Sequence, residues 1–496
     1  MLHKFFNKLS LIHYLCFGLF LFFIIQKICI YYGFHIGFAD LYYFDNSVWN
    51  LIHGNGLFLS YFNKSYFADH FYPYLYLLAP LYIIKPTPLW NYLFHAMILT
   101  AMTYPILDIA KHRFGKKGMI FTLILLIGTY TFRRQNMQDL HGDILMASFL
   151  AWIIHSFYFS NDKRAFLLTL LLPFAKENFI IVSFFIGLYF IFVRKNMKMG
   201  VIILSYSIVF FLFLIKLFIP HFNTSDYRHL ARYSYLGNAL SEQVRTIIFK
   251  PYILLLELLN AYKIAYVLLI FLPIIFLPLF SPYILLSIGV FAQNLLAITK
   301  TTCDLSTHYQ APLIPILAIA SIDGLYRLKI KLPTLSYQRL TKTFKKVAIF
   351  FLIINLFAFI FLDLRTLIIT KHILSANSVL KLIPKEASVS ASDHFFIKLN
   401  HRDYIYQFPG IIDADYIVFE DIEPTIPVNV NQIKYAKKLW NTGNKIKLLK
   451  YLVVGEYGTG NKNRYSKKVG NLLANPIFEV LFNENDVYLL KKKKRL

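Results

Sequence analysis

The residues whose types could support catalysis are gathered near the start of the chain, in a polar stretch that follows the first strongly apolar segment. Carboxylates and imidazoles can accept protons or bind divalent cations. Residues 38–73 contain three carboxylates and two histidines, namely Asp40, Asp45, Asp69, His53 and His70. Ionisable groups are costly inside a bilayer, so a membrane protein concentrates its chemistry where polar side chains meet water. This stretch is therefore the first candidate for a functional site.

A second set of polar residues lies in short segments between later apolar runs. Asp139, His141 and Asp143 belong to it, and together with Asp69 and His70 they offer oxygen and nitrogen ligands. Hard divalent cations prefer carboxylate oxygens, and a histidine ligand favours manganese or zinc over magnesium. A divalent cation, Mg²⁺ or Mn²⁺, is one expectation for these five residues. Hydrogen bonding between the loops is the alternative, because their spacing matches no diagnostic metal motif.

The composition excludes a soluble globular protein. Of 496 residues, 57% are hydrophobic and only 16% are charged. Several apolar runs reach the length of about 18 residues that a bilayer-spanning helix needs. The net charge of +26 would suit a nucleic-acid binder, but the basic residues cluster between apolar runs, at 111–117, 163–164, 194–198 and 329–346. This is the positive-inside pattern of cytoplasmic loops that contact anionic lipid. We therefore expect a lipid bilayer as partner and no nucleic acid.

Charge bias also orders the apolar runs into about eleven crossings of a prokaryotic inner or plasma membrane, with the amino terminus in the cytoplasm. Residues 1–370 then form a transmembrane domain with outer loops at 33–88, 133–143, 220–262 and 300–310. The proline-rich segment 71–84 is too short to cross and is expected at the interface. Carboxylates fall on the outer face, at Asp40, Asp45, Asp69, Asp139, Asp143, Glu177, Asp226, Glu242, Glu257 and Asp304. A single outward-facing site follows from this sorting.

The composition changes near residue 375, where charged residues become frequent. Short runs of alternating apolar residues predict strands at 387–390, 404–408, 415–419, 451–456, 477–482 and 487–490. Residues 432–449 have the pattern of an amphipathic helix, and Asn483–Asp486 that of a hairpin turn. We therefore expect residues 375–496 to form a small soluble α/β domain on the extracytoplasmic side.

A series of short motifs runs through nearly the whole chain. They are Asp40-Leu41, Phe44-Asp45, Trp49-Asn50, Asp69-His70-Phe71, Asp139-Leu140-His141, Lys176-Glu177, residues 277–282, Tyr309 with Pro312 and Pro315, Arg402, Phe408-Pro409 and Ala414-Asp415-Tyr416. In order and spacing they resemble the prokaryotic membrane family known as domain of unknown function 2079. That family is in turn similar to the C-type (GT-C) glycosyltransferases. The resemblance implies an α-helical polytopic membrane protein with a GT-C-like fold.

The resemblance also implies an activity. GT-C enzymes move a sugar from a polyprenyl-phosphate carrier to a glycan, lipid or protein acceptor outside the cytoplasm, and they place an acidic residue in the first outer loop. Asp40 would then be the general base that takes the proton of the acceptor hydroxyl. Asp45 would assist it or bind a metal. The alternatives are that Asp40 caps the helix expected over 41–51 and that Asp45 makes a simple polar contact.

The leaving lipid phosphate would develop negative charge, which cations stabilise. Arg133 and Arg134 lie on the outer side against the charge rule, and phosphate binding is a good reason to keep them there. Lys176 and Glu177 would lie near the same phosphate, or would form an ion pair buried at a helix turn. Two further residues are expected to line the cavity or to pack a loop, His308 and Tyr309.

Two other functions stay open from the sequence. A transporter or flippase of a lipid-linked substrate would place ionisable residues near the middle of the membrane and show paired repeats. Here the carboxylates lie in loops and no repeat is visible, which favours an enzyme. A non-catalytic assembly partner with the same fold is the other alternative. For an enzyme, the tail would recognise the acceptor. Its Arg402, Tyr404 and Tyr406 alternate on one strand, where they would face a sugar or pack the sheet.

Overall fold

The computed structural model describes residues 10–35, 39–223, 227–408, 414–420 and 469–493. The chain divides into two compact units. The helical unit comprises residues 1–25 and 64–356, and the sheet unit comprises residues 26–63 and 357–496. The boundary near residue 370 that the sequence suggested stays a prediction. The main difference from the predicted domains, 1–370 and 375–496, is that residues 26–63 belong to the same unit as the tail.

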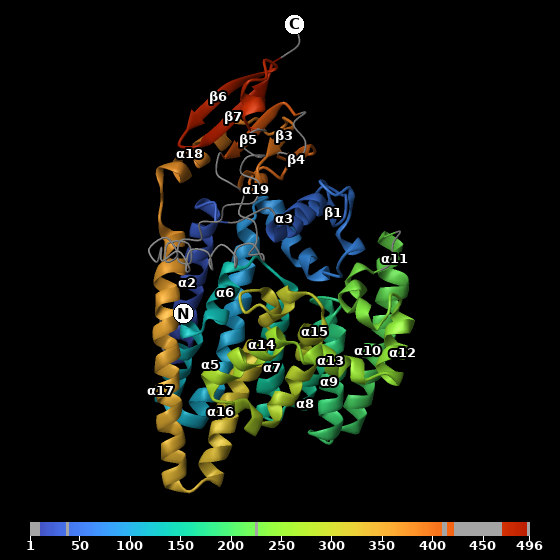
Figure 1. Ribbon diagram of the computed structural model, residues 1–496, viewed down its shortest axis with the longest axis vertical. Helices are drawn as coiled ribbons and strands as arrows, with labels where there is room; N and C mark the ends of the chain where they lie inside the picture. The colour runs from blue at the N-terminus through green and yellow to red at the C-terminus, as the bar shows by residue number, and fades with distance from the viewer. Residues whose placement is uncertain (1–9, 36–38, 224–226, 409–413, 421–468, 494–496) are drawn as a thin grey trace, which may run out of the picture. The chain divides into compact units, whose positions relative to one another are not determined.

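The helical unit is built almost entirely of helices (Figure 1). Among the described residues, the first helix is α2 (Leu11–Tyr32) and the last long helix is α17 (Thr334–Ala358). Between them lie α4 (Ala79–Ile84), α5 (Leu89–Gly128), α6 (Tyr130–Met137), α7 (Gly142–Tyr158), α8 (Asp162–Leu171), α9 (Phe179–Phe192), α10 (Met197–Phe213), α11 (Ile219–Phe222), α12 (Leu240–Phe249), α13 (Tyr252–Leu258), α14 (Ala261–Phe271), α15 (Ile288–Leu296) and α16 (Leu313–Lys331).

Among the described residues, three helices are long and apolar enough to cross a membrane, Leu11–Tyr32, Leu89–Gly128 and Met197–Phe222. A pair bent by 69°, Tyr252–Leu258 with Ala261–Ile274, adds a fourth if it forms one span. Other apolar helices are shorter, among them α7 and α9. The chain is a helical membrane protein, and the number of about eleven crossings stays a prediction.

Helix α5 contains a break at Gly115, where φ is 69° and ψ is −168°. Residues with a side chain rarely adopt this conformation, so glycine is required there. The break falls within the basic segment 111–117. The helix therefore changes direction where the sequence predicts a cytoplasmic segment between two apolar runs.

Two segments expected to be loops are largely helical. The outer loop predicted over 133–143 begins inside α6, which continues to Met137. The basic segment 329–346 is the end of α16 and the first half of α17, separated only by Leu332 and Pro333. Lysine and arginine favour helices, so charge alone does not end a helix where the apolar run ends.

Ionic contacts form two polar layers in the helical unit. In the first, Arg113 and Arg327 contact Asp323 at 3.2 and 2.7 Å, and Arg194 contacts Asp162 at 2.9 Å. Except for Asp323, these groups lie in or next to the predicted cytoplasmic segments.

Helix α7 connects this layer with the second one. Near its end, His155 Nε2 lies 2.9 Å from Asp108 Oδ2. In its first turn, Asp143 Oδ2 lies 3.1 Å from Lys176 Nζ. Basic segments therefore meet at one end of α7 and carboxylate-bearing loops meet at the other, which is the alternation that the charge bias predicts.

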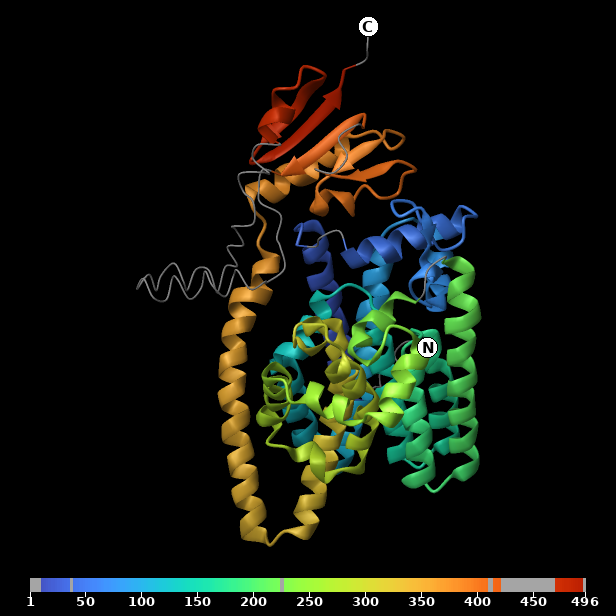
Figure 2. The ribbon, with the colours of Figure 1, turned by 45° about the vertical axis from the view of Figure 1, so that its right-hand side comes forward.

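The described part of the tail contains a five-stranded sheet (Figure 2). Its strands are β3 (Val389–Ala391), β4 (Ile405–Gln407), β5 (Tyr416–Glu420), β6 (Phe478–Glu484) and β7 (Val487–Lys492), in the order β4-β3-β5-β7-β6. Strand β3 is parallel to β4 and β5, whereas β7 is antiparallel to β5 and β6. These strands occur where the sequence predicted them. The predicted strand 451–456 and helix 432–449 lie outside the described residues.

The turn between β6 and β7 explains why this hairpin was readable from the sequence. Asn485 and Asp486 have φ of 50° and 63°. Two-residue hairpin turns need positive φ, which asparagine and aspartate tolerate best after glycine. The described tail also contains the helices α18 (Lys371–Val379) and α19 (Asp393–Phe396), the short helix η13 (Leu380–Leu382) and helical residues at 469–473.

The sheet unit also includes α3 (Ala39–Ile52) and the loop that follows it through β1 (Phe58–Leu59); β2 (Lys64–Ser65) begins after the unit's first segment ends. The ring of Phe396 packs against Tyr42 and Tyr61, with centroids 5.1 and 5.4 Å apart. Asn46 Nδ2 donates to the Asn400 carbonyl at 3.1 Å. An apolar contact and a polar one thus join the first polar stretch of the sequence to the tail.

Candidate functional site

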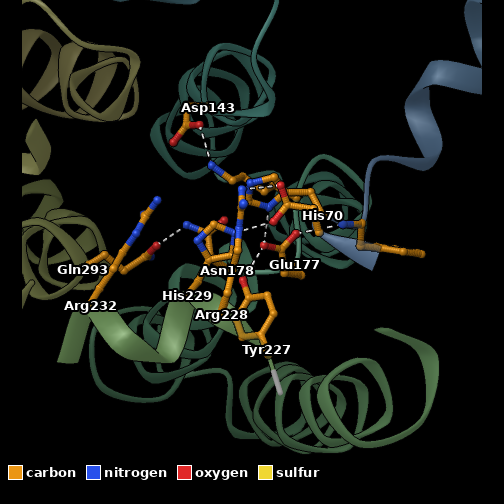
Figure 3. A network of polar contacts seen from close by, with 12 residues as sticks. His70, Asp143, Glu177, Asn178, Tyr227, Arg228, His229, Arg232 and Gln293 are labelled. Carbon is orange, nitrogen blue, oxygen red and sulfur yellow. Dashed lines mark hydrogen bonds and ion pairs between the residues drawn. The ribbon is translucent and has the colours of Figure 1, made fainter. Parts of the chain in front are cut away.

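The centre of the candidate site is Glu177, a carboxylate that is 1% exposed (Figure 3). Its Oε1 accepts hydrogen bonds from His70 Nδ1 at 2.8 Å and the Tyr227 hydroxyl at 2.5 Å, and its Oε2 accepts from the Phe71 amide at 2.9 Å. Burial opposes ionisation, but the charge and hydrogen bond of His70 outweigh it and keep the pKa of Glu177 well below its usual range. Glu177 is therefore charged at neutral pH.

Asp69, next to His70 in the chain, has its own partners. Its Oδ1 lies 3.0 Å from His229 Nε2, and its Oδ2 contacts the Arg228 guanidinium. Burial opposes ionisation, but the hydrogen bond from His229 and nearby positive charge lower the pKa of Asp69 to about 2. Burial, with the charge of His70, lowers the pKa of His229 to about 4. At neutral pH a neutral His229 therefore donates to an ionised Asp69.

Lys176 and Asp143 form a buried ion pair beside this network. The distance from Lys176 Nζ to Asp143 Oδ2 is 3.1 Å, and both side chains are 4% exposed. The ammonium also lies 5.6 Å from the ring centroid of Tyr309. Burial disfavours a charged lysine, but the Asp143 carboxylate outweighs it and raises the pKa of Lys176. Lys176 is therefore charged although its side chain is almost fully buried.

Two more predicted site residues lie against this pair. The rings of His141 and His308 stack with centroids 3.6 Å apart, and His308 Nε2 lies 3.9 Å from Asp143 Oδ2. The Tyr309 hydroxyl accepts a hydrogen bond from Arg232 Nη2 at 2.9 Å. Predicted residues from three separate segments thus meet at one place.

Short irregular segments position these groups. Asp69 and His70 follow η1 (Tyr66–Ala68), Lys176 and Glu177 lie between η3 (Leu172–Phe174) and α9, and the two other segments are η5 (Arg228–Leu236) and η10 (His308–Gln310). Gly142 permits their close approach, because a Cβ there would lie 2.3 Å from the Ala175 carbonyl oxygen. Without a side chain, α7 can begin directly against the turn that carries Lys176.

Two groups of side chains in the described part of the chain could hold a metal ion. One is Asp69, His70 and His229, and the other is His141, Asp143 and His308; within each, the ligand atoms lie within 4.8 Å of one another. The predicted ligands are divided between these groups, and Asp139 belongs to neither. In the first group, Glu177 binds His70 Nδ1 and leaves Nε2 for a metal, as metal-binding histidines usually require. In both groups a cation already contacts the carboxylate, Arg228 at Asp69 in the first and Lys176 at Asp143 in the second.

The two predicted phosphate-binding arginines differ in their surroundings. Arg133 is 6% exposed and donates to the carbonyls of Ile127, Gly128 and Asn355 at 3.0–3.2 Å. These contacts cap the carbonyl end of α5 and favour a structural role. Arg134 is half-buried, and its Nη1 lies 3.3 Å from Met137 Sδ.

The predicted catalytic carboxylates lie in the sheet unit. Asp40 is half-buried in the first turn of α3, where the positive end of the helix dipole favours a carboxylate. Asp45 is 0% exposed, and its Oδ2 lies 2.9 Å from His401 Nε2. The Trp49 ring stacks on His401, with centroids 5.9 Å apart. Asp45 therefore orients an imidazole and does not itself face solvent.

An apolar cavity of about 610 Å³ lies between α5, α6, α14, α16 and α17. Its lining includes Lys117 and Lys345 from the basic segments and also Gln310, which follows Tyr309. The cavity therefore extends from the basic polar layer toward the candidate site. Most of its wall consists of leucine, isoleucine and phenylalanine.

Sequence reasoning missed five residues of these networks, Tyr227, Arg228, His229, Arg232 and His401. The first four belong to the predicted outer loop 220–262, and they include two arginines. Outward arginines break the positive-inside rule, so the signal that singled out Arg133 could also have found them. Nothing in the sequence near His401 points to Asp45. Asp226, expected on the outer face, lies outside the described residues.

These features define a helical membrane protein with ionised groups buried where its loops meet. Residues 32–438 match the family described as "Predicted membrane protein (DUF2079)", and the chain belongs to this family. The crystal structure of ArnT from Cupriavidus metallidurans bound to undecaprenyl phosphate is similar to this chain at 12% sequence identity. The two structures align with a TM-score of 0.48, and the alignment covers 95% of this chain and 98% of the ArnT chain. No curated protein matches the chain.

Replacement of Lys176 by methionine tests how much the stability of the fold depends on the ion pair between Lys176 and Asp143. The variant leaves Asp143 charged and buried, so unfolding should become easier by about 3–5 kcal/mol. The double variant Lys176→Met/Asp143→Leu should recover most of this loss, because an apolar pair of similar volume has no uncompensated charge. Thermal unfolding of the purified protein in detergent measures both effects. Lys198→Met, at an exposed lysine, is the matched control. Equal stability of all four proteins would contradict the buried pair.

Proposed function

We propose that the protein is a membrane glycosyltransferase that moves a sugar from a polyprenyl-phosphate donor to an acceptor on the extracytoplasmic face. The observation that carries this proposal is the network of buried charges around Glu177, Asp69 and the Lys176–Asp143 pair. Ionisable groups whose pKa values are shifted by burial and by specific charged partners cluster at catalytic and binding sites. The acceptor would be a glycan, a lipid or a protein.

The phosphate of the donor would bind near Arg228 and Arg232. The Arg228 side chain is 60% exposed although it contacts Asp69, so it has donors left for an anionic oxygen. Arg232 contacts Tyr309 and could shift to a phosphate with little loss, since the tyrosine is neutral. Arginine suits this role because its planar fork matches two phosphate oxygens. Arg134, Lys176 and His308 remain further candidates.

The polyprenyl chain would enter the apolar cavity. The volume of about 610 Å³ and the apolar wall suit part of an isoprenoid chain. Gln310 lines the cavity and follows Tyr309, whose hydroxyl accepts a hydrogen bond from Arg232. Burial of such a chain contributes about 25 cal/mol per Å² of apolar surface. The donor would therefore be held at both its phosphate and its lipid.

Asp40 would be the general base. Its carboxylate is half-buried, so an acceptor hydroxyl could reach it and transfer its proton as the oxygen attacks the anomeric carbon. Asp45 would act through His401, since it is itself inaccessible. The bond between the sugar and the phosphate breaks, and the lipid phosphate leaves with the electron pair.

A divalent cation, Mg²⁺ or Mn²⁺, would be held by Asp69, His70 and His229. When bound it would stabilise negative charge on the leaving phosphate. Glu177 would orient His70 toward it, and Arg228 would supply a further positive charge at the same carboxylate.

A flippase is less well supported. The charged groups around Glu177 lie in segments between helices and in the first turn of α7, whereas transporters bind their substrates in broken helices near the bilayer midplane.

Transfer of labelled sugar from polyprenyl-phosphate donors, measured with purified membranes, tests the proposal. Asp40→Asn should lower turnover by about 10²–10⁴-fold, because the shape is kept and the base is lost. Expression and membrane insertion should be unchanged. Asp304→Asn, another carboxylate of the predicted outer face, is the control. Normal turnover of Asp40→Asn together with loss in Asp45→Asn would move the base to the Asp45–His401 pair. Absence of transfer by the wild-type protein with every donor would argue against the transferase.

Metal content after loading with Mn²⁺ and desalting tests the cation. The wild-type protein should retain one ion per chain, measured by mass spectrometry of the elements, and His229→Gln should lose it. His221→Gln, at an exposed histidine of the same region, should retain it. If the ion instead depends on His308, the metal belongs to the other group.

The topology follows from the alternating polar layers and the positive-inside rule. In a variant whose three cysteines are replaced by alanine, Asn483→Cys in the tail hairpin should react with an impermeant thiol reagent in intact cells, and Thr334→Cys should not. Both positions are exposed, so accessibility within the fold does not limit the labelling. The opposite pattern of labelling would place the site on the cytoplasmic face.

A further inference from the structure

The sheet unit contains a cavity of its own, with a volume of about 600 Å³. One wall is the segment from Asn50 to Asn63, and the other consists of residues 403–406 at the start of the edge strand β4. The volume falls within the range of about 300–1,000 Å³ that is usual for ligand sites. It has room for a short oligosaccharide.

The groups that line this cavity suit sugar hydroxyls. Asn55 and Asn63 are exposed, and an amide both donates and accepts hydrogen bonds, as a pair of neighbouring hydroxyls does. Tyr404 is 63% exposed, an unusual position for a large aromatic side chain on a folded domain. Tyr61 and Tyr406 are half-buried beside it. Tyrosine rings offer a flat apolar surface for the C–H face of a pyranose and a hydroxyl for its rim.

Of the three residues expected on one strand, only Tyr406 lies within β4 (Ile405–Gln407), and the surroundings of the three differ. Arg402 is 8% exposed and donates to the carbonyls of Pro384, Ala387 and Leu399, so it holds the sheet unit together. Tyr404 and Tyr406 line the cavity.

The charge of the residues that line this cavity limits the class of ligand that it can bind. Asp403 is the only charged residue among the described residues of the lining, in a chain whose net charge is +26. A phosphate, a carboxylate or an anionic lipid headgroup would meet a negative charge and no cation. A neutral glycan would meet only neutral partners apart from Asp403, and an amino sugar could also pair with its carboxylate.

The wall formed by residues 50–63 is held in place before any ligand binds. Asn50 Nδ2 donates to the Phe58 carbonyl at 2.9 Å and to Ser60 Oγ at 3.0 Å, and Asn46 Oδ1 accepts from the Ser60 amide at 2.9 Å. The Tyr61 hydroxyl donates to Gln407 Oε1 on β4 at 3.2 Å, which joins the two walls. A site fixed in this way loses little entropy on binding.

We propose that this cavity binds a neutral or amino-sugar oligosaccharide through Tyr404 and the asparagine amides. That the bound glycan is the acceptor of the transfer rests on the proposed function, whereas its binding does not. A peptide paired with the edge of β4 is the competing occupant, but strand addition relies on pockets for alternate side chains, and polar groups dominate this lining.

The test uses the full chain in detergent and two probes, triacetylchitotriose and cellotriose, with binding followed by saturation-transfer NMR and calorimetry. Either probe should bind, and Tyr404→Ala should weaken binding by about tenfold, the loss of roughly 1.4 kcal/mol expected for a central aromatic contact. Tyr404→Phe keeps the ring and should bind within about threefold of the wild type. Leu481→Ala, at an exposed side chain on the opposite edge strand β6, is the control and should bind normally.

Thermal unfolding of each variant separates lost binding from lost folding, and if Tyr404→Ala does not fold, Asn55→Ala, at an exposed amide of the lining, should weaken binding in its place. The proposal is overturned if neither probe binds, if Tyr404→Ala binds as well as the wild type, or if trigalacturonic acid or an unstructured peptide binds in place of the neutral probes. Because no donor is present, the outcome is independent of transfer. Glycan binding without transfer would count against the transferase alone, and transfer without glycan binding would count against this site alone.

Discussion

The structure of the candidate site depends on keeping Glu177 ionised where water is excluded. A buried carboxylate is stable only when donors replace its hydration, and its donors here come from His70, the Phe71 amide and Tyr227. These residues are about fifty to more than one hundred positions from Glu177 in the chain. Satisfying one charge therefore fixes three segments relative to one another. The same segments carry Asp69 and His229, so the geometry of the second carboxylate follows from that of the first.

The sequence allowed the location of this site to be predicted, but not its pairings. Charge bias orders the helices from local composition alone, and it sorted Asp69, Asp143 and Glu177 to one face before any contact was known. The alternation of apolar and polar residues in strands and the residue types that favour turns are also local features. They predicted the strands and the hairpin of the tail. The contact between Asp45 and His401 depends on tertiary packing across the whole chain. No local pattern reports that, so the sequence left three roles open for Asp45, which were to assist Asp40, to bind a metal or to make a simple polar contact.

Burial distinguishes residues that the sequence treated as equal. Arg133 and Arg228 are both arginines of predicted outer loops, yet the first is 6% exposed and spends its donors on helix carbonyls, whereas the side chain of the second is 60% exposed. A guanidinium that already satisfies carbonyls cannot bind phosphate without leaving them unpaired, which costs about 1–3 kcal/mol for each group. The violation of the charge rule at Arg133 therefore has a structural cause.

The distribution of charge over the protein follows from what each region contacts. A net charge of +26 is concentrated in segments predicted to meet anionic lipid, and cations also accompany the buried carboxylates of the helical unit. The cavity of the sheet unit is lined by amides, hydroxyls and rings with a single carboxylate. In so basic a chain, a ligand site of this size without a lysine or arginine excludes anionic ligands by its composition. An anionic donor and an uncharged acceptor would then be separated by electrostatics, because each site offers the partners that the other lacks.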